Sequence, residues 1–106
     1  MESFFATSAA TVACVHRSTN ERRHELDAAG PGDSLRCECE CRRIECFSDF
    51  RVVAETYDDV RAHSRYFLVA PGHQSPDEAV ISRTQAYVVI EMTGMSGDAA
   101  EALSGS

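Results

Sequence analysis

The chain has 106 residues, which is enough for one small domain. Its formal net charge of -7 argues against a surface for nucleic acid or anionic membranes, because both attract clustered positive charge. Only about a fifth of the residues are Leu, Ile, Val or Phe, so the apolar core is thin and a bound metal or a disulfide would add useful stability.

The N-terminal part of the chain carries few large apolar side chains. Residues 1–16 lack the positive start and strongly apolar centre of a secretory signal, and we expect a flexible tail there. Residues 17–30 favour a polar surface helix that stops at a Gly-Pro-Gly turn, with His16 and His24 exposed to solvent on or beside it. An odd number of cysteines without a secretion signal indicates a reducing, cytoplasmic compartment.

Residues 34–92 are predicted to form the folded unit. A cysteine-rich run over residues 35–46 leads into residues 47–53, which alternate between polar and apolar side chains. This combination predicts a hairpin closed by the cysteines. Residues 54–63 then carry apolar side chains at helical spacing, which predicts a short helix with one buried stripe.

Three apolar runs follow that helix. Residues 66–70, 79–83 and 87–92 each predict a strand, and the first of them ends in a Pro-Gly turn. Residues 93–106 are rich in Gly, Ser, Ala and acidic side chains, so we expect a disordered C-terminal tail. The predicted fold class is α+β, a small antiparallel sheet with one or two helices.

The hairpin region holds four of the five cysteines. On an extended segment Cys37, Cys39 and Cys41 share one face, and two thiols at this spacing can bind one zinc ion if the backbone bends. Cys46 is placed to join them from the turn, and His73, just past the Pro-Gly pair, is placed to supply a fourth ligand. Grouped cysteines in a cytosolic chain bind metal more often than they form a loose reduced cluster, so we expect a zinc-knuckle-like hairpin that staples the domain.

Beyond the cysteines, the sequence contains a wider pattern in four segments. These are C-E-C-x4-C over residues 39–46, Y-x-x-V-R over 57–61, F-L-V-A-P-G-H over 67–73 and Y-V-V-I-E over 87–91. The pattern resembles small uncharacterised proteins of high-GC, actinobacterial-type bacteria, for which no activity is established. The resemblance implies Cys39, Cys41, Cys46 and His73 as the ligand set, and Cys37 stands where those proteins carry another residue type.

Two other residues stay open as replacement ligands. Cys37 allows an alternative register within the cysteine run. His63 falls in the last turn of the predicted helix, where a favourable interaction with the helix dipole is its ordinary explanation. Arg36, Arg42 and Arg43 flank the cysteines, and we expect their charge to offset the net charge of about -1 of a zinc ion held by three thiolates and a neutral imidazole.

These features predict a non-enzymatic accessory or regulatory protein that binds zinc and contacts an unidentified protein partner. Neither nucleic acid nor a membrane is expected as a partner, and the oligomeric state is left open. The alternative is a thiol redox sensor in which oxidation of the cysteine cluster, with Cys37 as a spare thiol, releases the zinc. A zinc hydrolase is disfavoured, because four protein ligands would fill the tetrahedron that catalytic zinc keeps partly open.

Overall fold

The structure of the chain, a computed structural model, describes residues 2–27, 30 and 32–104, and the side chains of these residues except 2–7 and 27. The elements among the described residues are α1 (Glu2–Asp27), β1 (Ser34–Glu38), β2 (Asp49–Val53), α2 (Ala54–Arg61), β3 (Tyr66–Val69), β4 (Ala79–Arg83), β5 (Val88–Glu91) and α3 (Gly94–Ser104). The predicted α+β class is confirmed. The described part of the chain has two small antiparallel sheets and three helices, where one sheet and one or two helices were expected.

The two sheets divide the strands by their place in the sequence. β1 and β2 form the expected hairpin, with Cys37 opposite Phe50. Phe50 and Val52 are buried while Asp49 and Arg51 are exposed, as the alternation predicts. The second sheet has the order β3-β5-β4, so β5 lies at its centre.

The core forms where α2, β3 and β5 meet. α2 buries Ala54 and two larger side chains, Tyr57 and Val60, as the predicted stripe requires, whereas Val53, which the same helical spacing included, is 45% exposed. The largest side chains with less than 2% exposure include Tyr57, Phe67, Leu68, Ile90 and Met92. Strands β3 and β5 contribute three of these five side chains, whereas β4 is largely exposed, so α2, β3 and β5 form the centre of the core.

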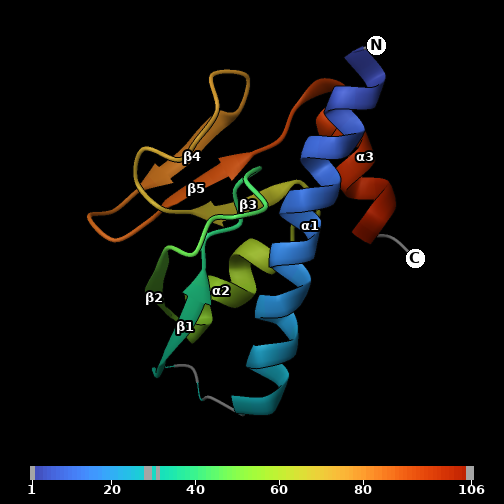
Figure 1. Ribbon diagram of the computed structural model, residues 1–106. Helices are drawn as coiled ribbons and strands as arrows, with labels where there is room; N and C mark the ends of the chain where they lie inside the picture. The colour runs from blue at the N-terminus through green and yellow to red at the C-terminus, as the bar shows by residue number, and fades with distance from the viewer. Residues whose placement is uncertain (1, 28–29, 31, 105–106) are drawn as a thin grey trace.

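Helix α1 differs from the sequence expectation. It is continuous from Glu2 to Asp27, where a flexible tail over residues 1–16 and a helix from residue 17 were expected. Figure 1 shows α1 along one side of the molecule, with α3 beside its N-terminal half and the β1–β2 hairpin near its C-terminal half. Ala10 and Ala13 are completely buried. The N-terminal half of α1 therefore packs through small side chains, and these do not form the stripe of large apolar residues by which a buried helix face is recognised in a sequence.

Helix α3 lies where a disordered tail over residues 93–106 was expected; residues 105 and 106 are outside the described residues. It buries Ser96, Gly97 and Ala100. A helix rich in small residues cannot bury much surface alone, but it can approach another helix closely. The small side chains of α1 provide that close surface, and α3 packs along it.

A helix that crosses a bilayer must be both long and apolar. Within the described residues, no helix combines these two properties.

Candidate metal centre

The loop between β1 and β2 carries Cys39, Cys41 and Cys46, and its backbone pairs first with the residue before β2 and then with β3. The Cys39 N–H donates to the Ser48 carbonyl at 2.9 Å, which continues the pairing of the hairpin. The next N–H, that of Glu40, donates to the Leu68 carbonyl of β3 at 2.7 Å. The chain therefore changes partner strand between Cys39 and Glu40, and this change bends the backbone at the cysteines.

Four side chains converge at this bend. The ligand atoms of Cys39, Cys41, Cys46 and His73 all lie within 4.8 Å of one another. His73 Nδ1 is 3.5 Å from Cys39 Sγ and 3.5 Å from Cys46 Sγ. Cys39 and Cys41 are buried, whereas Cys46 and His73 are partly buried. The structure thus brings together the four residues that the sequence singled out.

The spacing of these atoms suits one tetrahedral ion. With Zn–S distances of about 2.3 Å and Zn–N distances of about 2.0 Å, a tetrahedral site has S···N edges of about 3.5 Å and S···S edges of about 3.8 Å. The two measured S···N separations of 3.5 Å match such an edge. The cluster could therefore hold a metal ion if its most distant ligand atoms, which lie up to 4.8 Å apart, move closer by as much as about 1 Å.

Backbone N–H groups point at the sulfur atoms. The Ala70 N–H donates to Cys39 Sγ at 3.1 Å. The backbone of Arg43 hydrogen-bonds the Cys41 sulfur, and that of Ser48 the Cys46 sulfur, each from two residues further along the chain. Hydrogen bonds of this kind favour the negatively charged thiolate and fix its direction toward the ion.

The pKa values of the three thiols differ because their burial differs. Burial raises the pKa of Cys39 and of Cys41, although the backbone hydrogen bond to each sulfur opposes the shift. At Cys46 burial also raises the pKa, but hydrogen bonds from the Ser48 backbone and the neighbouring thiols outweigh it, and the net pKa is lowered. Metal binding at this cluster must therefore displace protons from Cys39 and Cys41.

The loop after β3 positions His73. Gly72 has a φ of +87°, in the left-handed region where glycine is favoured, and its turn brings the His73 N–H to the Ala70 carbonyl at 3.0 Å. The same Ala70 donates its own N–H to Cys39 Sγ. Ala70, directly after β3, therefore hydrogen-bonds both a cysteine ligand, Cys39, and the histidine ligand, His73.

Arg42 ties the cysteine loop to the segment that follows His73. Its Nε donates to Glu78 Oε2 and its Nη2 to Asp77 Oδ2, both at 2.9 Å. The Glu78 side chain is 2% exposed and also accepts the Ser75 N–H. Arg36 likewise pairs with Asp49. Arg36 and Arg42 therefore neutralise nearby carboxylates. They offset less of the negative charge of a zinc–thiolate site than the sequence led us to expect.

The other candidate ligands lie outside the cluster. Cys37 is 1% exposed and packs in the core, where burial raises its pKa to about 12. His63 is exposed, follows the end of α2 and stacks on Tyr66 with ring centroids 4.3 Å apart. The sequence left Cys37 open as a ligand, and it lies outside the cluster: the hairpin pairing continues through Cys39, and the chain turns toward β3 only at Glu40.

Sequence reasoning missed three polar residues that support the loop. His16 was expected to be exposed but is 7% exposed, and Asn20 and Glu40 are 2% and 0% exposed. Glu40 stands between two of the clustered cysteines in the sequence. This position is the one feature of the sequence that could have indicated a supporting role for Glu40. No pattern in α1 separates His16 and Asn20 from surface residues.

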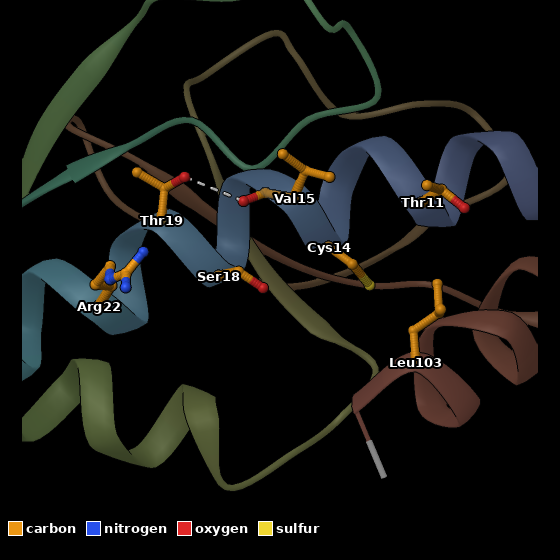
Figure 2. Close-up of a pocket in the computed structure, with 7 residues that line it drawn as sticks. All are labelled: Thr11, Cys14, Val15, Ser18, Thr19, Arg22 and Leu103. Atoms are coloured by element: carbon orange, nitrogen blue, oxygen red, sulfur yellow. Dashed lines mark hydrogen bonds between the residues drawn. The ribbon is translucent and has the colours of Figure 1, made fainter. Parts of the chain in front are cut away.

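A hollow of about 600 Å³ lies elsewhere, between α1 and α3. Figure 2 shows the side chains of Cys14 on α1 and Leu103 on α3 facing each other across it. The remaining lining residues are Thr11, Val15, Ser18, Thr19 and Arg22. With one thiol and no imidazole or carboxylate, this lining does not offer the ligands of a metal site.

Comparison of the chain with known protein families, with curated proteins and with solved structures finds no match.

Proposed function

We propose that the chain is a small zinc-binding protein that acts without enzymatic activity, as an accessory or regulatory protein in the cytoplasm. The observation that carries this proposal is the convergence of three cysteine sulfurs and one imidazole nitrogen within 4.8 Å. Thiolate and imidazole ligands in a tetrahedral arrangement favour zinc over Mg²⁺ and Ca²⁺, which prefer oxygen.

The number of ligands supports a structural role for the ion. Catalytic zinc keeps a coordination position for water or substrate, whereas Cys39, Cys41, Cys46 and His73 would fill all four positions. The resemblance to small proteins of high-GC bacteria is part of the proposal and implies the same ligands. It adds no reaction.

A protein partner is proposed from the surface of the cysteine loop. Ile44 and Phe47 lie between or beside the ligands and are 76% and 88% exposed. Large apolar side chains held outward by a rigid loop are a common feature of protein contacts. The net charge of -7 supports neither nucleic acid nor an anionic membrane as the partner.

The proposal is tested by native mass spectrometry of the purified, reduced protein. We expect one zinc ion per chain, retained by the Cys14→Ser variant and lost when Cys46 or His73 is replaced by Ala. A folded chain without metal, or one that retains iron in preference to zinc, would contradict the proposal. Phe47→Ser should leave the zinc content unchanged, and so it separates partner contact from metal binding.

The second candidate function is a thiol redox sensor. Cys46 is partly exposed, so an oxidant can reach it. Peroxide would oxidise two of the clustered thiolates to a disulfide, be reduced to water itself, and release the zinc. Cys37 lies outside the cluster, so the disulfide would have to form among the ligands. Peroxide titration with simultaneous zinc release and mass mapping tests this function, and zinc that stays bound until the protein denatures would exclude it.

A further inference from the structure

The side of α1 that faces the cysteine loop carries polar side chains. We name residues 38–46 of this loop the metal loop. Asn20 is 2% exposed, and its side chain pairs with both backbone groups of Glu38. Nδ2 donates to the Glu38 carbonyl at 2.9 Å, and Oδ1 accepts the Glu38 N–H at 2.8 Å. The side-chain amide therefore replaces a strand partner for the residue directly before Cys39.

Asn20 also reaches the other side of Cys39. Its Nδ2 donates to Glu40 Oε2 at 2.8 Å. Glu40 stands between Cys39 and Cys41 in the sequence, and it is completely buried. Its carboxylate accepts two further hydrogen bonds, from Arg61 Nη2 at 2.6 Å and from the Leu68 N–H at 2.9 Å. One amide on α1 thus holds both neighbours of a ligand, and Glu40 extends the network to α2 and β3.

His16 lies one helical turn before Asn20 and contacts the metal loop at two residues, Glu38 and Arg43. Its Nδ1 is 3.0 Å from Glu38 Oε1, and its Nε2 is 3.0 Å from the Arg43 carbonyl. The same Arg43 carbonyl accepts the N–H of the ligand residue Cys46 at 3.2 Å. The imidazole is 7% exposed, so water does not compete freely for either contact.

We propose that α1 is a clamp on the metal loop, with His16 and Asn20 as positioning residues that hold Cys39 and Cys41 in the liganding geometry. This inference rests on the proposed metal-binding function. Outer-shell hydrogen bonds that fix ligands typically change metal affinity by about 10–100-fold. Because coupling between two binding events is reciprocal, metal in the cluster also strengthens the docking of α1.

The choice of polar residues on this face supports a positioning role. Apolar side chains of similar volume would fill the same space and avoid the cost of burying an imidazole and an amide. They could not fix the backbone of Glu38 or the carbonyl of Arg43. Elsewhere on α1, where no metal loop is contacted, the completely buried residues include Ala10 and Ala13.

The test compares zinc release from His16→Phe and Asn20→Leu with release from the unchanged protein. Each variant keeps the approximate side-chain volume and removes the hydrogen bonds to the metal loop. We expect zinc to pass to an excess of a strong chelator about 10–100-fold faster from either variant. The visible absorption of the cobalt(II)-substituted protein, which reports coordination geometry, should change as well.

Arg17→Met is the matched control. Arg17 lies on the same helix and is 4% exposed, but it donates to the carbonyls of Ser64 and Ala100. Arg17→Met should lower the denaturant midpoint, yet it should leave the cobalt(II) spectrum and the zinc release rate near those of the unchanged protein. A similar acceleration in Arg17→Met would show that any loss of stability has this effect, and the clamp would be refuted.

His16→Gln provides a milder variant, should His16→Phe fail to fold. Its amide can donate to the Arg43 carbonyl, so we expect a release rate between those of the unchanged protein and His16→Phe. If the unchanged protein holds one zinc and His16→Gln and Asn20→Leu release it at the unchanged rate, the clamp is wrong and the metal site stands. If the unchanged protein binds no zinc, the proposed function itself fails.

Discussion

Cys37 and Cys39 are two residues apart in the sequence and lie in different surroundings. Cys37 is opposite Phe50 in the hairpin and is enclosed by the core. Cys39 lies where the backbone turns from β2 to β3, and its sulfur faces His73. A thiol in the first setting behaves as a small apolar group, whereas a thiol in the second can bind a metal.

We predict opposite effects of the same substitution at these two positions. Cys39→Ser should abolish zinc binding and unfold the domain, because it removes a ligand. Cys37→Ser should keep one zinc per chain and reduce the free energy of unfolding by about 1–3 kcal/mol, because it buries a hydroxyl in the apolar core. Metal analysis and denaturant unfolding of both variants check this prediction. Equal zinc loss in both would place Cys37 among the ligands.

Zinc binding should weaken as the pH falls. The raised pKa of Cys39 and Cys41 means that both thiols carry protons in the metal-free protein, and zinc must displace them. Affinity should therefore be greatest at high pH and fall by as much as about tenfold per pH unit for each protonated thiol. Zinc retention measured against a chelator between neutral and acidic pH tests the sign, and a pH-independent affinity would contradict the proposed ligands.

At the scale of elements, α2 begins without a side-chain cap. Val53 occupies the N-cap position in extended conformation, with φ -61° and ψ 136°, and makes no capping hydrogen bond. The Ala54 N–H is instead satisfied by the Asp33 carbonyl at 2.7 Å. A side-chain oxygen at residue 53 would instead accept a hydrogen bond from the second or third N–H group of the helix, because an N-cap side chain reaches these groups.

Val53→Thr should therefore stabilise the protein. Thr has nearly the shape of Val, and Val53 is 45% exposed, so the change loses little packing. We expect the free energy of unfolding to rise by about 1 kcal/mol, since a capping oxygen is gained. Thermal unfolding of the zinc-loaded protein measures the effect, with Val53→Ala as the comparison that gains no oxygen. An unchanged or lower melting temperature for Val53→Thr would contradict the assignment of the cap.

The contact between the cysteine loop and the His73 loop can be tested in the same way. Glu78→Ala should reduce the free energy of unfolding by about 1–3 kcal/mol, because it leaves the Ser75 N–H and part of the Arg42 guanidinium without their buried acceptor. Asp77→Ala is the control, since the Asp77 side chain is 58% exposed and such ion pairs contribute about 0–1 kcal/mol. Equal effects in unfolding measurements would show that Glu78 has no special part in joining the loops.

At the scale of the whole molecule, the thin core makes the ion important for folding. Tyr57, Phe67 and their neighbours form one small cluster, while the buried side chains of α1 and α3 are small or polar. Structural zinc contributes about 10–16 kcal/mol in small peptides, which is comparable with the stability of an entire domain. The coupling between metal and fold should therefore be strong.

We predict that a chelator unfolds the domain and that added zinc restores it. Circular dichroism should show loss of cooperative thermal unfolding in excess chelator and its return with one equivalent of zinc. The restored melting temperature should rise with free zinc concentration, because a ligand that binds the folded state stabilises it by mass action. A chelated protein that melts cooperatively at the zinc-loaded temperature would show that the core is sufficient by itself.

The sequence by itself determined the features that depend on local pattern. The alternation before Val53, the helical spacing around Tyr57 and the apolar runs of β3 and β5 predicted elements close to those observed, because these patterns reflect which side chains are buried. β4 was also predicted, although its side chains are largely exposed. Residue type and turn position predicted a site with Cys46 and His73 but left the choice among Cys37, Cys39 and Cys41 open. The resemblance implied Cys39, Cys41, Cys46 and His73, and their ligand atoms do lie together.

The tertiary structure alone decided the features that depend on fit between distant segments. α3 and the N-terminal half of α1 are helices built on small residues, and small residues become favourable only when another surface approaches closely. Cys41 reaches Cys39 and His73 because the chain changes partner strand after Cys39, and a two-residue alternation does not predict this bend. His16 and Asn20 are buried because the metal loop offers them backbone partners, and a polar side chain carries no local sign that such partners exist.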